Sequence, residues 1–375
     1  MKKILLILLV LCLLCANTTA LATTEEQLNE QVENTMENLD YSDLEQIGDE
    51  HLGDFSQLVE QILNGDFGNV GSFASFLLDL FCKEIVAILP QALALLVVVV
   101  VCGLLKKGNG FVSSETDKVV QFVGLAVVAT TLVGLVVSCY QSVQQMLGNL
   151  QVLCDASSPV ILALVVANGG NSLSSVCQPS MVFLSSTIVT FCSQLLLPIS
   201  LAGMVLIFAG NISSNVKIGK LQKFVNDSLG WVLGVVFMVF SAFSTVSGIS
   251  ASVVDGVSYR TAKFATKNYI PILGGYISDG LDVVVASASL VKNSLGLATL
   301  VVLVAMMVKP LLHIGCLNFA LQGVSALAES LGNDSFGKVL GDVGKVLNFW
   351  IALVCAVCFM FAIVVTIAIC SANGV

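Results

Sequence analysis

Residues Val346–Cys370 read VLNFWIALVCAVCFMFAIVVTIAIC, and no charged side chain interrupts the run. As an α-helix this segment would be about 37 Å long, which exceeds the roughly 30 Å hydrocarbon core of a bilayer. Similar runs recur along the chain, and hydrophobic residues make up 56% of its 375 positions against 11% charged residues. A soluble chain carries about a quarter charged residues. The sequence therefore predicts an all-α, polytopic helical membrane protein, and its continuous runs argue against a β-barrel.

We expect about six to eight spans, some of them broken or re-entrant. The clearest further runs are Ile85–Leu105, Val119–Cys139, Met181–Ile212 and Leu229–Ile249. Met181–Ile212 is longer than one crossing needs and has Pro198 near its middle, which predicts a strong kink or two half-length elements.

Three other regions leave the number of crossings open. Val152–Ala167 is short and contains Asp155 and Pro159, so it is interpreted as a re-entrant or interfacial element. Two apolar runs flank Lys309 and Pro310, namely Leu295–Val308 and Leu311–Leu327. The segment Gly332–Lys345 is expected to be a polar loop before the last span.

The N-terminal region is predicted to lie outside the cytoplasm, after a signal peptide. Residues 1–22 have the charged start, apolar core and small-residue cleavage site of a signal peptide. Residues 23–71 form an acidic, helix-patterned region without Lys or Arg, so we expect a small extracytoplasmic ectodomain. Residues 72–84 are predicted to form an interfacial helix before the membrane domain, which covers 85–375.

Charge and motifs exclude several classes of function. The net charge of −9 argues against nucleic-acid binding. The sequence has no HExxH, GxSxG or Walker A motif and no spaced metal-ligand set, so we expect neither an enzyme nor a cofactor or metal. His313 is expected to be structural, and the Cys355–Cys358 pair is interpreted as helix packing. No small-molecule substrate is assigned.

A polar stretch interrupts the apolar chain at 253–293, which reads VVDGVSYRTAKFATKNYIPILGGYISDGLDVVVASASLVKN. Arg260, Lys263 and Lys267 would share one helix face, and Pro271 should break the helix. We expect an assembly or pathway surface, or alternatively an interfacial hairpin whose basic face meets lipid headgroups. If Leu229–Ile249 crosses once, this basic face lies opposite Lys217, against the positive-inside tendency. The candidate surface residues are Asp255, Arg260, Lys263, Lys267, Asn268, Pro271, Asp279, Asp282, Lys292 and Asn293.

With these residues the chain resembles the stage III sporulation protein AE family of endospore-forming bacteria. The likeness rests on segments inside 253–293, and outside them it is a similarity of pattern over most of the chain. These segments are Asp255-Gly256, Arg260–Phe264, Ile270-Pro271 and Val284–Ser289, with Asn268, Asp279, Asp282, Lys292 and Asn293.

The resemblance implies a multi-pass component of the complex that links the mother cell to the forespore. It implies partners from the same operon, namely a cytoplasmic ATPase, ring-forming subunits and small membrane proteins. It implies a role in forespore maintenance and late forespore gene expression, without catalytic residues. The pore- or gate-forming subunit is our inference from the size of the membrane domain. A stand-alone secondary transporter and a purely structural scaffold are the alternatives.

Overall fold

The computed structural model describes residues 41–52, 59, 70–107, 114–167, 172–212, 219–269 and 274–370. This part of the chain is helical and contains no strand. Its elements are α3 (Ser42–Leu52), α5 (Val70–Lys107), α6 (Ser114–Ala167), α7 (Ser172–Phe191), η1 (Cys192–Leu196), α8 (Leu197–Ile212), α9 (Gly219–Tyr269), α10 (Gly274–Ser330) and α11 (Asp334–Cys370).

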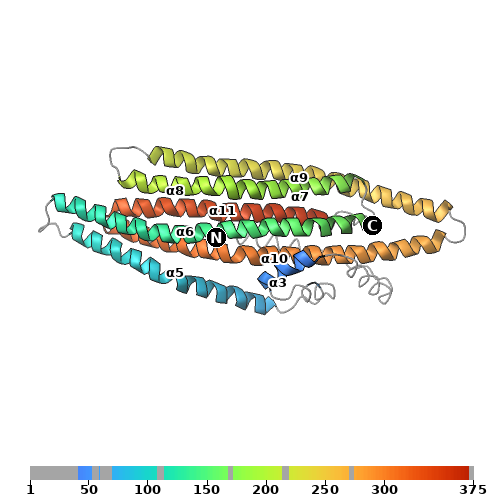
Figure 1. Cartoon of the computed structure of the whole chain (residues 1–375), viewed down its shortest axis with the longest axis horizontal. Coiled ribbons are helices and arrows are strands. Elements are labelled where there is room, and N and C mark those ends of the chain that lie inside the picture. The colour runs from blue at the N-terminus through green and yellow to red at the C-terminus, as the bar shows by residue number, and fades with distance from the viewer. Residues whose placement is uncertain are drawn as a thin grey trace.

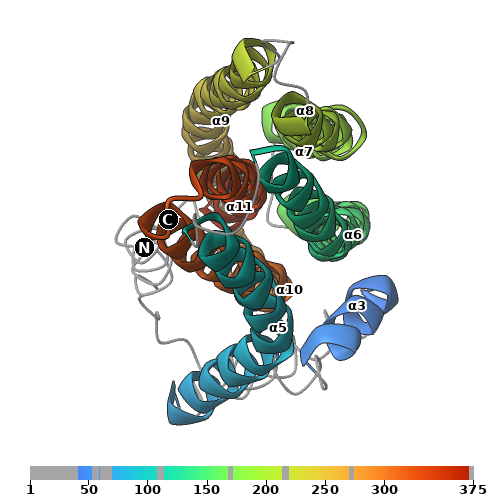
Figure 2. The same cartoon turned by 90° about the vertical axis from the view of Figure 1, so that its left-hand side faces the viewer.

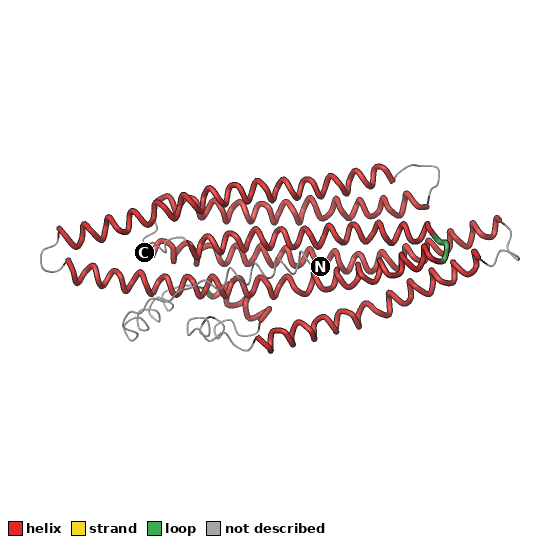
Figure 3. Tube along the Cα trace, turned by 180° about the vertical axis from the view of Figure 1, so that it is seen from behind, coloured by secondary structure: helices red, strands yellow, loops and turns green. Residues whose placement is uncertain are grey.

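The long helices form an elongated bundle in which successive helices run in opposite directions (Figures 1 and 3). α7, η1 and α8 follow one another as a single rod. Seen along the bundle, α11 lies in the middle, and it packs against α6, α7, α8, α9 and α10 (Figure 2). Six helices of the described part are long and apolar enough to cross a membrane. This agrees with the lower limit of six to eight expected spans.

A tryptophan fixes the centre of the bundle. Trp350 of α11 is fully buried, and its indole N–H donates to Ser200 Oγ of α8 over 2.6 Å. Its ring meets the ring of Tyr140 of α6 edge to face, with 6.0 Å between centroids. Further along α11, Phe359 packs against Phe237 of α9 at 5.9 Å. These contacts combine large apolar burial with a satisfied indole donor, and they hold three other helices around α11.

The turn between α10 and α11 corrects the predicted polar loop over Gly332–Lys345, which is wrong. Gly332 has φ 79°, its N–H donates to Glu329 O, and the N–H of Asn333 donates to Ala328 O. This Schellman-type ending closes α10 in three residues, and α11 starts at Asp334. The residues Phe336, Val339, Leu340 and Val343 are buried at helical spacing. Asp334, Ser335 and Lys338 are exposed between these positions, as on an amphipathic helix, whereas Asp342 is buried.

Two pairs of predicted runs merge into single helices. Val119–Cys139 and Val152–Ala167 both belong to α6, so Val152–Ala167 is not a re-entrant element. Leu295–Val308 and Leu311–Leu327 both belong to α10, which continues through Pro310. A proline removes one backbone donor, but neighbouring helices and local adjustment let apolar helices continue past it.

The predicted break near Pro198 takes the form of a π-helical turn. Over Cys192–Leu196 the helix widens, and the N–H of Leu197 donates to Cys192 O, five residues earlier. Pro198 has no backbone N–H and cannot continue the α-helical hydrogen-bond pattern, and the π-helical turn directly before it accommodates this missing donor. The rod continues in the same direction into α8, so Met181–Ile212 is neither sharply bent nor divided into two crossings (Figure 1).

The N-terminal region differs from the predicted arrangement. Helix α3 packs against α6 and α10, and its Leu44 is 1% exposed within the same core as the long helices. A separate ectodomain is therefore not supported. Residues 72–84 continue directly into the first apolar run as part of α5. The predicted signal peptide at 1–22 lies outside the described residues.

The packing of α5, α6 and α11 gives a first prediction. A Cβ at Gly124 of α6 would overlap Cys102 of α5 and lie 3.1 Å from Phe336 of α11, whereas Gly134 has nothing within 4 Å of that position. Gly124→Leu should lower stability by about 1–3 kcal/mol because it overpacks the contact. Thermal unfolding of the detergent-solubilised chain measures the effect, and Gly134→Leu is the matched control. Equal melting temperatures for both variants would contradict the packing described here.

Candidate functional site: a polar contact between three helices

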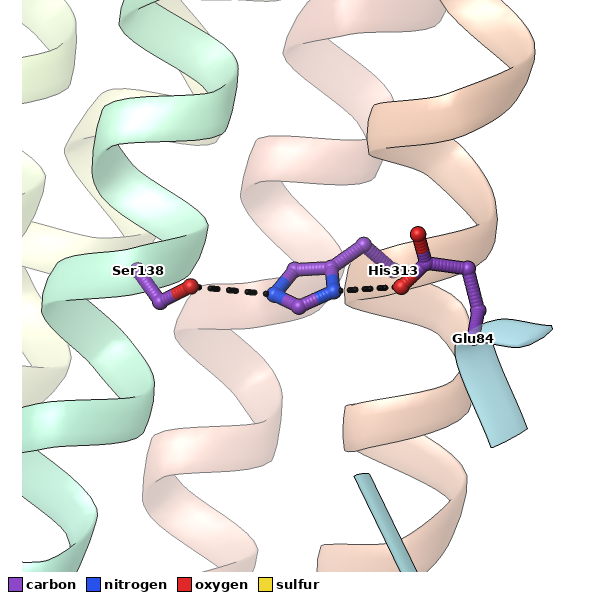
Figure 4. A network of polar contacts seen from close by, with 3 residues as sticks. All are labelled: Glu84, Ser138 and His313. Atoms are coloured by element: carbon purple, nitrogen blue, oxygen red, sulfur yellow. Dashed lines mark hydrogen bonds and ion pairs between the residues drawn. The ribbon is translucent and has the colours of Figure 1, made fainter. Parts of the chain in front are cut away.

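Three polar side chains from distant parts of the sequence meet where α5, α6 and α10 pack together (Figure 4). His313 Nδ1 of α10 lies 2.8 Å from Glu84 Oε2 of α5. On the other edge of the imidazole, His313 Nε2 lies 3.3 Å from Ser138 Oγ of α6. The imidazole therefore links all three helices.

The site is partly shielded from solvent. The side chain of His313 is 20% exposed and that of Glu84 is 15% exposed, while Ser138 lies on an exposed face of α6. Glu84 directly precedes the first apolar run of α5, and His313 lies one turn after Lys309 and Pro310. Hydrogen bonds to a charged partner are stronger than neutral ones, and poor solvation strengthens them further. The contact thus ties α5 to the rest of the bundle.

The same geometry satisfies the hydrogen bonds of His313 whether its imidazole is neutral or protonated. When the imidazole is neutral, Nδ1–H donates to the Glu84 carboxylate and Nε2 accepts from the Ser138 hydroxyl. When the imidazole is protonated, both nitrogens donate, and the Ser138 oxygen becomes the acceptor. The change between the two states needs one proton from outside the contact and a rotation of the serine hydroxyl.

The order carboxylate, imidazole, hydroxyl is also that of serine hydrolases. Such enzymes need donors for the oxyanion, often backbone N–H groups. Ser138 lies in the middle of α6, where backbone N–H groups bond within the helix. The arrangement therefore suits proton holding and helix linkage better than acyl transfer. The described residues contain no group of three or more His, Cys, Asp or Glu side chains that could hold a metal ion.

The predicted surface at 253–293 is separate from this contact. Its segment forms the end of α9 and the start of α10, and the two helices are joined at one tip of the bundle (Figure 1). Helix α9 is described as far as Tyr269 and α10 from Gly274, and the two helices run in opposite directions. Pro271 lies outside the described residues. So do the side chains of the other predicted residues before 286, namely Asp255, Arg260, Lys263, Lys267, Asn268, Asp279 and Asp282.

The length of α9 bears on the predicted conflict of topology. Arg260 lies about 60 Å along the helix axis from Gly219, at 1.5 Å per residue. This is about twice the thickness of a hydrocarbon core. The basic residues of the stretch therefore lie at the opposite end of α9 from Lys220 and Lys223.

Lys292 and Asn293 lie inside the helix packing. Lys292 is 2% exposed, and Asn293 is half-buried with its Oδ1 atom unpaired. One turn further on, Gly296 packs so closely on Ile369 that a Cβ there would lie 2.5 Å from that side chain. Lys292 thus lies near the C-terminal end of α11, where the helix dipole favours a cation. Any role of Lys292 is internal to this chain and not part of an exposed surface.

Sequence reasoning missed the contact of Glu84, Ser138 and His313. His313 was expected to be structural, and neither partner was singled out. The available signals were a carboxylate at the start of an apolar run and a histidine within another. Nothing in the sequence pairs them, because the helices that carry Glu84 and His313 are far apart along the chain.

The bundle of six apolar helices fits the class of helical membrane proteins. The family model described as Stage III sporulation protein AE matches residues 53–372, and the chain belongs to this family. A curated relative, Stage III sporulation protein AE of Bacillus subtilis (strain 168), is 27% identical over 215 residues, which are 57% of this chain and 54% of the relative. The match thus spans about half the length of the relative. No solved structure matches the chain.

The polar contact gives a second prediction. Glu84→Ala and His313→Ala should each destabilise the chain, and the double variant should lose less than the sum, with a coupling of about 1–3 kcal/mol. Thermal unfolding of the four proteins in detergent measures this cycle. Additive losses would show that the two side chains do not interact.

The same site gives a third prediction about chemistry. Because the backbone N–H groups around Ser138 bond within α6, we expect no covalent labelling by a fluorophosphonate probe. Ser138→Ala is the matched control for background labelling. Stoichiometric labelling that depends on Ser138 would overturn the interpretation of this site as non-catalytic.

Proposed function

We propose that this protein is a non-enzymatic, multi-pass membrane subunit of a channel or secretion-like complex between mother cell and forespore. The observation that carries the proposal is the combination of the family with a bundle of six long apolar helices. In this role the protein contributes the membrane path, and a partner supplies ATP hydrolysis. The complex maintains the forespore and permits its late gene expression.

The distribution of basic residues supports a definite orientation of the protein in the membrane. The protein lies in the mother-cell membrane around the forespore, with its N-terminal region extracytoplasmic. One end of the bundle carries Lys220, Lys223, Lys338 and Lys345, which suits the cytoplasmic side. The other end carries the tip of α9 and α10, which is long enough to extend beyond a bilayer.

The tip of α9 and α10 is the proposed assembly surface for the other proteins of the operon. The partners at this tip are the ring-forming subunits and the small membrane proteins, whereas the cytoplasmic ATPase would bind at the opposite end of the bundle, which carries Lys220 and Lys223. The charged positions at this tip follow the apolar part of α9 in the sequence, and we propose that they bind a partner or anionic lipid. A structural scaffold would use the same tip without forming a pore.

The role in sporulation is tested by deleting the gene in the organism that carries it. We expect arrest after engulfment, with loss of late forespore transcription measured by a forespore-specific reporter. Complementation with the wild-type chain is the control. Normal numbers of heat-resistant spores and full reporter activity in the deletion strain would exclude this function.

The assembly surface gives a fourth prediction. Changing Arg260, Lys263 and Lys267 together to Ala should reduce spore formation, because a charged contact at the tip is lost, while the chain still accumulates in membranes. Arg260→Lys, Lys263→Arg and Lys267→Arg together form the matched control that keeps the charge. Wild-type sporulation of the Ala variant would count against this surface.

A proton-coupled secondary transporter remains the second candidate, and one observation favours it. Glu84 and His313 form an ionisable pair between helices, which is a common arrangement in proton relays. Uptake of a solute by the purified chain in liposomes, driven by a pH gradient and abolished by His313→Ala, would support the transporter. Absence of uptake together with the deletion phenotype would favour the subunit of a complex.

A further inference from the structure

One face of α6 changes character halfway along the helix. Up to the middle its exposed side chains are mostly apolar, with Thr130 as an exception, and they include Val119, Val123, Val127, Val133 and Val137. From the middle onward the exposed positions are mostly polar or small, with Val152 as the apolar exception, and they include Gln141, Gln144, Gln145, Gly148 and Asp155. The two sets continue one another on the same side of one unbroken helix. We therefore expect the environment of this face to change near Ser138, from apolar before it to polar after it.

Two aromatic contacts fix the level of this polar face relative to α9. Helices α6, α9 and α11 run in the same direction. Tyr140 of α6 is level with Trp350 of α11, and Phe237 of α9 is level with Phe359, nine residues further along α11. Because all helices rise equally per residue, the segment 141–155 of α6 is level with the segment 229–243 of α9.

At that level α9 exposes apolar side chains. Trp231 is 71% exposed, Met238 69% and Val239 59%. α6 and α9 lie on different sides of α11 (Figure 2). At one level, therefore, one side of the bundle presents a surface suited to lipid and another presents amides and a carboxylate. Side-chain amides without partners in hydrocarbon cost several kcal/mol each, at about 2–7 kcal/mol for a polar group.

Charged side chains occur at the same level. The contact of Asn318 Nδ2 with Asn348 Oδ1, at 2.7 Å, aligns α10 with α11. Helix α10 runs in the opposite direction to α11, and Lys309 lies nine residues before Asn318. Lys309 is therefore level with residue 357 of α11, which is inside the apolar run of that helix. Lys309 is exposed and shares a face with His313, which contacts Ser138 on α6. Lys309 thus lies on the side of α10 that contacts α6 through His313, at the level of the polar face of α6.

We infer that the face of α6 from Gln141 to Asp155 lines a water-filled pathway within the membrane, and that the contact of Glu84, Ser138 and His313 forms its inner end. This inference deepens the pore-forming part of the proposed function and rests on the placement of the bundle in a membrane. The wall is neutral along the helix apart from Asp155. It therefore suits water and small hydrated polar solutes, whose selection by charge depends on Asp155 and on the ionisable Lys309, His313 and Glu84 of the neighbouring helices.

The experiment compares cysteines at matched levels in the full-length chain, with the native cysteines replaced, in open membrane fragments. Gln145→Cys lies on the polar face, and Trp231→Cys lies at nearly the same level on the apolar side. Val133→Cys tests the apolar half of α6, and Lys338→Cys, at an exposed position near the start of α11, is the accessible control. Each is treated with a small charged methanethiosulfonate and with a maleimide carrying a 5 kDa polyethylene glycol.

We expect the small reagent to modify Gln145→Cys at least about tenfold faster than Trp231→Cys or Val133→Cys, since only a solvated thiolate reacts. The large reagent should modify only Lys338→Cys, because a pathway inside the membrane excludes it. Reaction of Gln145→Cys with both reagents would place this half of α6 outside the membrane and overturn the inference.

Two further outcomes would also overturn it. No reaction at Gln145→Cys would show that protein or lipid covers the face, and fast reaction at Trp231→Cys would show that this level lies in water. These results do not depend on spore formation. A failure of the pathway is therefore distinguishable from a failure of the proposed role in sporulation.

Discussion

The structure depends on one constraint, which is that a backbone surrounded by apolar groups must satisfy its own hydrogen bonds. In this chain the constraint produces helices that continue through proline and glycine, so α6 and α10 each join two apolar runs. At Pro198 the same constraint gives a π-helical turn, in which the N–H of Leu197 reaches back to Cys192, and the rod does not reverse. The number of candidate spans in the described part of the chain follows from this continuity, because each merger removes a possible loop.

Once the helices are continuous, the polar side chains along them need partners from neighbouring helices. Trp350 hydrogen-bonds to Ser200, Asn318 to Asn348, and Glu84 to His313. Each pair joins two helices, so the polar groups specify which helices meet and at what level. The contact of Glu84, His313 and Ser138 differs from the others because it holds two ionisable groups and adjoins an exposed polar face.

The levels set by these contacts also link packing to the proposed function. They place the amide-rich half of α6 at the same level as exposed apolar side chains of α9, on a different side of the central helix α11. A bundle with a polar face on α6 and an apolar face on α9 at the same level fits a protein that separates lipid from a water-filled pathway. The tip of α9 and α10 lies further along the bundle, so the proposed assembly surface and the proposed pathway are separate parts of the chain.

The sequence alone determined the class of protein, the family and most of the helical residues, because apolar run length and composition are local properties. It also contained the amphipathic pattern of Phe336, Val339, Leu340 and Val343, although the polar residues between them suggested a loop. Only the tertiary structure decided that α3 joins the common core and that α11 is central. It alone brought Glu84, Ser138 and His313 together. The physical reason is that one apolar helix face resembles another, so partners and levels are selected by the complementary packing of side chains that are distant in sequence.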